Sequence, residues 1–206
     1  MTRKDLEFMG SVTAGMTHEI NNVLAVIRES SGLLEDLVSL AGEGDIPHRD
    51  KFVRNLSGIG RQVERGVRLT NTLNRLAHSV DHPEESVGSG DLMELAEALT
   101  RRNASRAHVE IVANGDGSGF SVVVDPFRAL ERVCRCVVEM VAHCREGSTV
   151  TMRAHAPDKA VLILTDPDSL RETPQSPACE PCAGVSVDLW AGEGRTGFVV
   201  RLGTGG

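Results

Sequence analysis

Three polar residues near the N-terminus have the types and spacing of a small reactive site. They are His18, Glu19 directly after it, and Asn22 one helical turn further on. A neutral imidazole is a competent nucleophile near neutral pH, because the ordinary pKa of histidine is about 6.5. An adjacent carboxylate can accept the proton on Nδ1 and leave Nε2 free to attack. Such a group suits phosphoryl transfer, which mainly requires positioning and charge stabilisation.

The surrounding pattern predicts that His18 faces outward from a long helix. Apolar residues recur at three- and four-residue intervals and fall within roughly 60° of the side opposite His18 on an ideal helix. These apolar residues are Leu6, Met9, Val12, Met16, Ile20, Val23, Leu24, Ile27, Leu34 and Val38. An exposed histidine is usually only a solvated polar residue. Small side chains around His18 favour instead a surface that a macromolecular partner can approach, with the contact residues Ala14, Gly15, Asn22, Ala25 and Glu29.

The segment Ala14–Leu24 resembles the H box of two-component sensor histidine kinases, whose usual form is A-G-x-A-H-E-I-N-N-P-L. The resemblance implies that His18 accepts a phosphoryl group and that Glu19 assists as the base. It also implies that Asn22 helps to dephosphorylate a response regulator. Val23 stands where the family usually has proline, so we expect a straighter helix after the histidine.

The first part of the chain is predicted to form two long helices, over residues 4–40 and 49–77, joined by a turn at 41–47. Such a pair makes an antiparallel hairpin, but one hairpin cannot cover both of its apolar stripes. We therefore expect residues 1–80 to dimerise into a four-helix bundle, as the family does. The alternative is a monomer whose C-terminal half covers the hairpin. Residues 65–71 of the second helix are a further expected contact region for a partner.

Residues 81–206 predict an α/β sandwich, which makes the chain α+β as a whole. A Gly- and Ser-rich linker at 78–90 precedes a helix at 91–102 that Asp91 can cap, and a second helix follows from Pro126 to Cys144. Six strands are predicted, at 109–113, 120–124, 149–154, 160–165, 185–190 and 197–202. The segment Asn114–Gly117 suggests that the first two strands form a hairpin.

This order of elements resembles the ATP-binding domain of the same kinases. Val124-Asp125-Pro126 and the segment Gly194–Phe198 carry the resemblance, and a generic α/β sandwich is the alternative. Cys136 and Met140 stand where the family has two asparagines, the second of which helps to hold magnesium, an ion that prefers oxygen ligands. The segment Asp166–Leu170 lacks the two glycines that allow a nucleotide to approach the backbone.

Only thirteen residues separate Leu170 from Gly184, too few for a glycine-rich lid and the helix after it. We therefore expect this domain to keep the fold and to have lost ATP. No cofactor is expected on this chain, and Mg²⁺ is expected only on a partner receiver domain.

Composition excludes several other classes of protein. The formal net charge of -7 argues against a nucleic-acid partner. No apolar run approaches the roughly 18 residues of a membrane span, so a cytoplasmic protein is expected. Five cysteines do not suggest a disulfide framework, and the single C-x-x-C pair Cys179 and Cys182 is weak support for zinc or thiol chemistry. Cys136, Met140 and Cys144 share a helix face and are expected to be buried.

The sequence thus predicts a phosphotransferase. It would be a homodimeric histidine phosphotransferase that relays a phosphoryl group between aspartates of response-regulator receiver domains through His18, without ATP. A hybrid histidine kinase is a further possible partner. Two alternatives stay open: a response-regulator phosphatase that uses Asn22, and a non-catalytic module that binds a receiver or a kinase. An active ATP-dependent histidine kinase is the least favoured interpretation.

Overall fold

The structure is a computed structural model that describes residues 3–39, 49–82, 84–114, 119–175 and 184–204. The chain divides into two compact units, Met1–Asn74 and Arg75–Gly206, and each is described by itself. The boundary lies inside the second long helix. The predicted α+β class is confirmed, because the N-terminal helices are followed by sheets and further helices.

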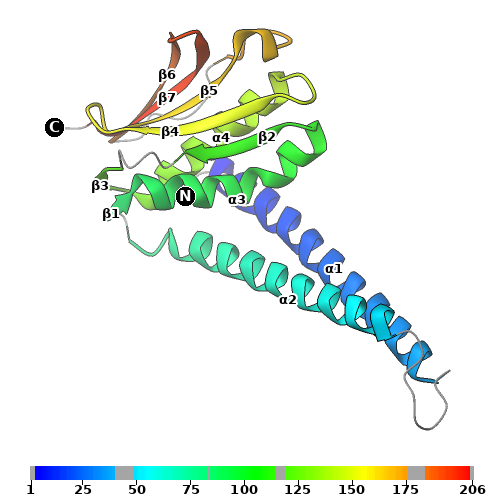
Figure 1. The fold of residues 1–206 in the computed structure, drawn as a ribbon. Coiled ribbons are helices and arrows are strands. Elements are labelled where there is room, and N and C mark those ends of the chain that lie inside the picture. Colours follow the sequence, from blue (N-terminus) through cyan, green and yellow to red (C-terminus); the bar gives the residue numbers. More distant parts are fainter. Residues whose placement is uncertain (1–2, 40–48, 83, 115–118, 176–183, 205–206) are drawn as a thin grey trace. The chain divides into compact units, whose positions relative to one another are not determined.

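The first unit is a pair of long helices, α1 (Arg3–Ser39) and α2 (Arg49–His78), which lie side by side (Figure 1). Both match the predicted helices, and the predicted turn between them falls outside the described residues. α1 is continuous through Val23, where the family's proline would interrupt the backbone hydrogen bonds. A Cβ added to Gly66 on α2 would lie 3.4 Å from Cγ1 of Val23, a van der Waals distance, so the two helices are neighbours at this level.

The second unit is built on a mixed five-stranded sheet in the order β2-β4-β5-β7-β6. Only the β2–β4 pair is parallel. The strands are β2 (Glu110–Asn114), β4 (Thr149–His155), β5 (Ala160–Thr165), β6 (Gly184–Gly192) and β7 (Arg195–Thr204). β5 is buried along its whole length because it lies in the middle of the sheet and is apolar on both faces.

The predicted hairpin of the first two strands is wrong. β2 joins the large sheet beside β4, whereas β3 (Ser121–Val124) pairs in antiparallel register with β1 (Glu85–Gly88) in a separate two-stranded sheet. β1 lies in the segment predicted to be a linker. Its pairing partner is more than thirty residues away along the chain, so no local pattern indicated a strand there.

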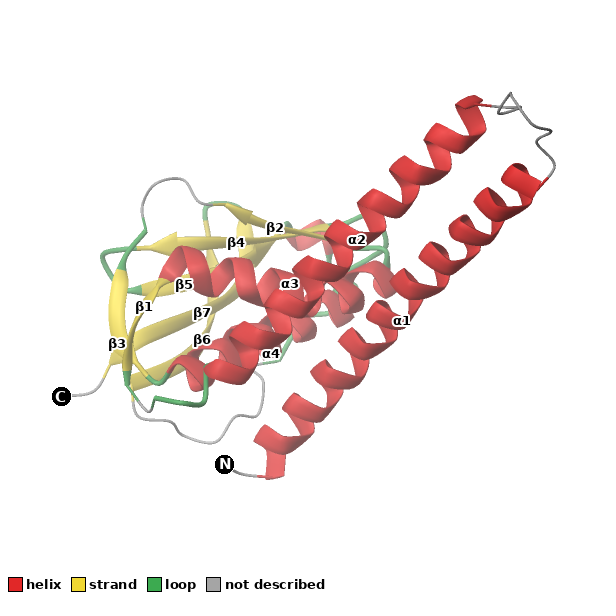
Figure 2. Cartoon of the chain, turned by 90° about the horizontal axis from the view of Figure 1, so that it is seen from below, coloured by secondary structure: helices red, strands yellow, loops and turns green. Residues whose placement is uncertain are grey.

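Two helices cover the sheet, α3 (Ser89–Ala107) and α4 (Pro126–His143), and they pack against each other (Figures 1 and 2). α4 begins as predicted, with Pro126 in its first turn and a carboxylate oxygen of Asp125 accepting a hydrogen bond from the backbone N–H of Arg128 at 3.0 Å. The predicted cap of α3 is wrong. Gly88 occupies the N-cap position without a side-chain hydrogen bond, and Asp91 lies in the first turn.

The glycines near the end of the chain are required by the sheet itself. Glu193 and Gly194 both have positive φ, 52° and 71°, as the two-residue turn between β6 and β7 demands. A Cβ added to Gly197 would lie 1.9 Å from the carbonyl oxygen of Ile163 on the neighbouring strand. The segment that resembles a nucleotide-binding glycine turn therefore has a complete structural explanation in this chain.

Candidate functional site

His18 lies exposed on α1, as the helical geometry predicts. Nδ2 of Asn22 lies 3.1 Å from Nδ1 of the imidazole, within hydrogen-bonding distance across one helical turn. When the carboxamide presents its NH2 group to the ring, Nδ1 must be the unprotonated nitrogen. The nearest described partner of the imidazole is thus an amide and not a carboxylate.

Glu19 is directed toward the second helix. Its carboxylate oxygen Oε2 lies 3.3 Å from a guanidinium nitrogen of Arg65 on α2, and its side chain is 19 % exposed against 50 % for Arg65. Consecutive residues on a helix diverge by about 100°, so a side chain that faces α2 points away from its exposed neighbour. Within the described part of the chain, Glu19 and His18 are not hydrogen-bonded to each other.

Arg65 is the residue of this constellation that sequence reasoning did not assign to the chemistry. Its position in the predicted contact region 65–71 gave a partial signal. The missing information was the register between the helices, which places Gly66, the neighbour of Arg65, beside Val23 of α1. The structure also places the predicted contact residues on one accessible surface: Ala14, Asn22, Ala25 and Glu29 are exposed and Gly15 is half-buried.

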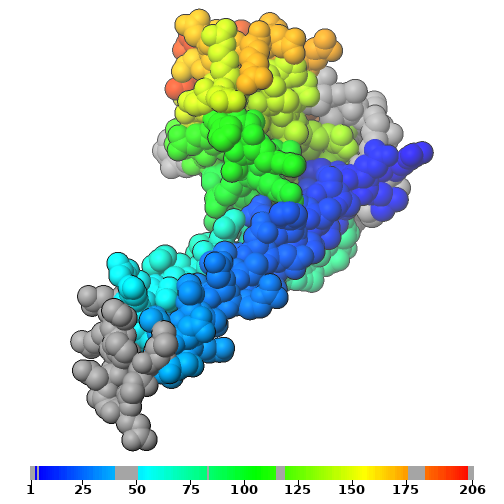
Figure 3. Space-filling model, turned by 90° about the vertical axis from the view of Figure 1, so that its right-hand side faces the viewer, coloured from blue at the N-terminus to red at the C-terminus, as the bar shows by residue number. Residues whose placement is uncertain are grey.

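Large apolar side chains of the hairpin remain accessible. The outer surface of α1, in blue, is visible along most of its length in the space-filling view (Figure 3). The apolar residues concerned are 42–60 % exposed, and they are Leu6, Leu24, Val26, Leu33 and Val38 of α1 with Val53, Leu56, Val63 and Val67 of α2. Monomeric proteins rarely leave so many large apolar residues exposed on one element pair, which makes the hairpin a candidate for association.

The residues of the second unit do not fit the magnesium–ATP that the kinase resemblance implies. Cys136 and Met140 are both 0 % exposed in α4, so neither side chain faces a ligand. Burial raises the pKa of the Cys136 thiol to about 12, which keeps it neutral, and a thioether is a poor ligand for a hard cation. Pro167–Ser169 form a short 3-10 turn in place of a glycine-rich strand-to-loop connection.

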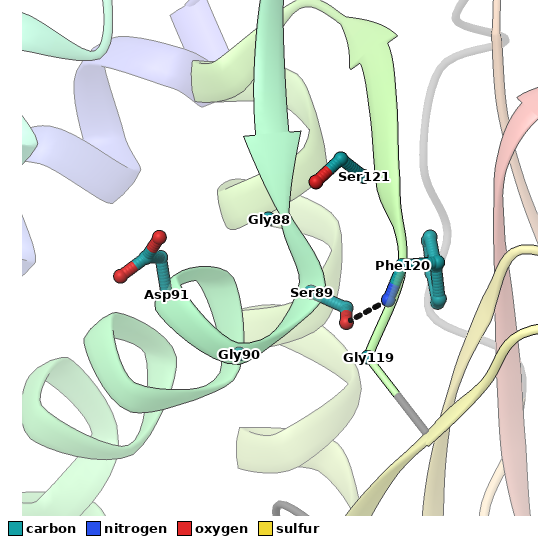
Figure 4. A pocket seen from close by; sticks show the side chains of 7 residues that line it. All are labelled: Gly88, Ser89, Gly90, Asp91, Gly119, Phe120 and Ser121. Atoms are coloured by element: carbon teal, nitrogen blue, oxygen red, sulfur yellow. Dashed lines mark hydrogen bonds between the residues drawn. The ribbon is translucent and has the colours of Figure 1, made fainter. Parts of the chain in front are cut away.

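A shallow hollow of about 430 Å³ at the start of α3 offers no alternative nucleotide site (Figure 4). Among the described residues that line it, Asp91 is the one with a charged side chain, and its carboxylate would repel phosphate groups. The hydroxyl of Ser89 already has a hydrogen-bond partner, because it accepts a hydrogen bond from the backbone N–H of Phe120 at 3.0 Å. The other lining residues are Gly88, Gly90, Gly119 and Ser121.

The described residues offer neither a metal site nor a membrane-spanning helix. In the part of the chain that the structure describes, His, Cys, Asp and Glu side chains form no cluster of three that could hold a metal ion. The pair Cys179 and Cys182 falls outside the described residues. None of the described helices has the length and apolar character needed to cross a membrane.

Comparison with known proteins gives remote structural similarity only. No protein-family model matches the sequence, and no curated protein matches it significantly. A histidine kinase from Burkholderia phymatum is 13 % identical over 100 % of both chains with a TM-score of 0.43. The histidine kinase AdeS of Acinetobacter baumannii is 10 % identical, with 92 % of this chain and 98 % of that chain covered and a TM-score of 0.41.

A third solved structure contains the histidine kinase ThkA in complex with the response regulator protein TrrA. It is 16 % identical to this chain, covers 98 % of this chain and 63 % of its own, and has a TM-score of 0.42. At these identities and TM-scores the similarity does not establish an activity for this chain.

Proposed function

We propose that this chain is a histidine phosphotransferase that relays a phosphoryl group between the aspartates of response-regulator receiver domains through His18, without ATP. The observation that carries the proposal is the pairing of an exposed imidazole with a second unit whose side chains do not fit ATP. His18 lies in a surface of small residues, whereas Cys136 and Met140 are fully buried where nucleotide-holding amides would stand. The phosphoryl donor must therefore come from another protein.

The transfer itself needs little from this chain beyond the nucleophile. The lone pair on Nε2 attacks the phosphorus of an aspartyl phosphate on the donor receiver. The N–P bond forms, the P–O bond breaks, and the aspartate leaves as a stable carboxylate. The reverse reaction delivers the phosphoryl group to the aspartate of a second receiver. Mg²⁺ held by the receiver would neutralise charge on the phosphoryl oxygens.

The test is transfer from a receiver that has been phosphorylated with radioactive acetyl phosphate. We expect label to move to the protein within one turnover and to be lost in His18→Ala, because only the imidazole supplies the nucleophile. His155→Ala is the matched control, since it removes another solvent-accessible histidine and should transfer normally. Labelling from radioactive Mg-ATP with no receiver present would contradict the proposal.

A phosphatase is the second candidate function, and it is favoured by the exposed carboxamide of Asn22 one turn from His18. In that reaction Asn22 would orient water against the acyl phosphate without any phosphohistidine. Comparing His18→Ala with Asn22→Ala separates the two. Dephosphorylation that survives the first variant and is lost in the second supports the phosphatase. Receiver binding with no phosphoryl chemistry in any mixture would support the non-catalytic module instead.

A further inference from the structure

The inference concerns how the protonation of His18 is controlled, and it rests on the proposed function. The carboxylate beside the histidine is held by α2: Arg65 lies 3.3 Å from Oε2 of Glu19, which is mostly buried at 19 % exposure. Guanidinium groups bind carboxylates with directional, charge-assisted hydrogen bonds. Glu19 is therefore kept from the imidazole by a partner on another helix.

Nδ1 of His18 has a different partner, the amide of Asn22 at 3.1 Å. With the NH2 group donating, the neutral ring carries its proton on Nε2. That tautomer has no lone pair on Nε2 and cannot attack phosphorus from that nitrogen. The arrangement in the structure is thus an inactive one. Attack by Nε2 requires the other tautomer, in which the proton is on Nδ1 and is donated in a hydrogen bond to an acceptor.

We propose that Arg65 is a positioning residue that sets the tautomer of His18 by holding Glu19. When the guanidinium releases Glu19, the ring gives its Nε2 proton to water and takes up a proton from water at Nδ1, and the new Nδ1–H donates a hydrogen bond to the Glu19 carboxylate. The Nε2 lone pair then forms the N–P bond while the P–O bond to the donor aspartate breaks. The proton stays on Nδ1 throughout, so the step balances without any external base.

The test is the ¹⁵N spectrum of labelled histidine in the protein alone, at about pH 8, where an ordinary imidazole is neutral. The His18 signals are assigned by their loss in His18→Ala. In the wild type we expect Nδ1 at the position of an unprotonated ring nitrogen. In Arg65→Ala it should move toward the protonated position, with the tautomer ratio changed about two- to fivefold, the range of a partly exposed ion pair.

Three further variants test whether the effect of Arg65 on the His18 tautomer acts through Glu19. Arg68→Ala removes an arginine one turn further along α2 that has no ion-pair partner among the described residues, and its spectrum should match the wild type. Arg65→Lys keeps a cation and should also match. Arg65→Ala with Glu19→Ala should restore the wild-type Nδ1 signal, because the released carboxylate is then absent. A purely structural role for Arg65 would not give that reversal.

An unchanged Nδ1 signal in Arg65→Ala would overturn the inference, as would failure of the double variant to restore it. Single-turnover transfer from a phosphorylated receiver should be faster in Arg65→Ala by about the same two- to fivefold factor. The spectra need no receiver, so absence of transfer in every protein would overturn the proposed function while the tautomer result stayed readable. Far-UV circular dichroism confirms that each variant remains helical.

Discussion

Cys136 lies in α4 at a position that corresponds to an amide in the domain that the sequence resembles, and its thiol is fully buried. Burial raises the pKa of Cys136 to about 12, with opposing effects from nearby charges, and it also raises the pKa of Cys134 and Cys144. Desolvation disfavours the thiolate in each case, so these cysteines act as apolar core residues.

These raised thiol pKa values predict alkaline sensitivity of the second unit. The unfolded thiols lose their protons from about pH 9, whereas the folded ones keep theirs, so the free energy of unfolding falls above that pH. The loss should be about 1 kcal/mol at pH 10 for each of the two most strongly shifted thiols, Cys134 and Cys136. Urea unfolding followed by the fluorescence of Trp190, at pH 7.5 and pH 10, measures it. The variant Cys134→Ala/Cys136→Ala should show a smaller difference between the two pH values, and an equal difference would contradict this account.

The exposure of His18 could be predicted from the sequence, because helical geometry alone turns His18 away from the apolar residues of α1. The exposure of Ala14, Asn22, Ala25 and Glu29 followed from the same rule. The pairing of Glu19 with Arg65 did not, since it joins two residues 46 positions apart in sequence and depends on how their helices are aligned. Which charged side chains of two helices pair depends on the register between the helices. The sequence pattern of each helix alone does not determine that register.

At the scale of elements, strand identity was predictable and strand pairing was not. The alternation and β-branched content of β4, β5, β6 and β7 marked each strand. The turn residues after β2 suggested a hairpin. In the structure β2 pairs with β4 and so joins the large sheet, which continues toward the buried strand β5. Such a choice depends on burial gained far away in sequence, so local turn signals mislead.

The hairpin of α1 and α2 has an apolar surface that predicts dimerisation. Val63 and Val67 are 49 % and 54 % exposed and lie one turn apart on α2. We expect Val63→Glu to weaken the dimer at least about 100-fold, because an unpaired carboxylate in an apolar interface costs several kcal/mol. Light scattering after size exclusion, over a dilution series, gives the dissociation constant.

Arg54→Glu is the control for that experiment, since it places the same carboxylate on the opposite side of α2. Arg54 is exposed, and its replacement should leave the dimer intact. A wild-type protein that is monomeric at all concentrations would favour the alternative in which the rest of the chain covers the hairpin.

At the scale of the whole molecule, the two units differ in which side chains they expose and which they bury. The first presents His18, and the second is a sheet covered by two helices with an apolar core. At the two positions where the resemblance would place nucleotide-holding amides, Cys136 and Met140 are 0 % exposed, as is Val137 between them. Burial of apolar surface stabilises such a fold without a bound ligand.

This separation predicts that nucleotide does not stabilise the protein. A ligand present at 100 times its dissociation constant stabilises the folded state by about 2.7 kcal/mol, which raises Tm by roughly 10 °C in a domain of this size. We expect millimolar Mg-ATP to shift the unfolding of the second unit by less than about 1 °C on that scale. Trp190, the only tryptophan, reports this unit by fluorescence, and Mg²⁺ alone and ATP alone are the controls. A shift of several degrees that needs both components would mean that α4 and the turn at Pro167–Ser169 hold nucleotide through groups other than amides and glycines, and His18 would then have an internal donor.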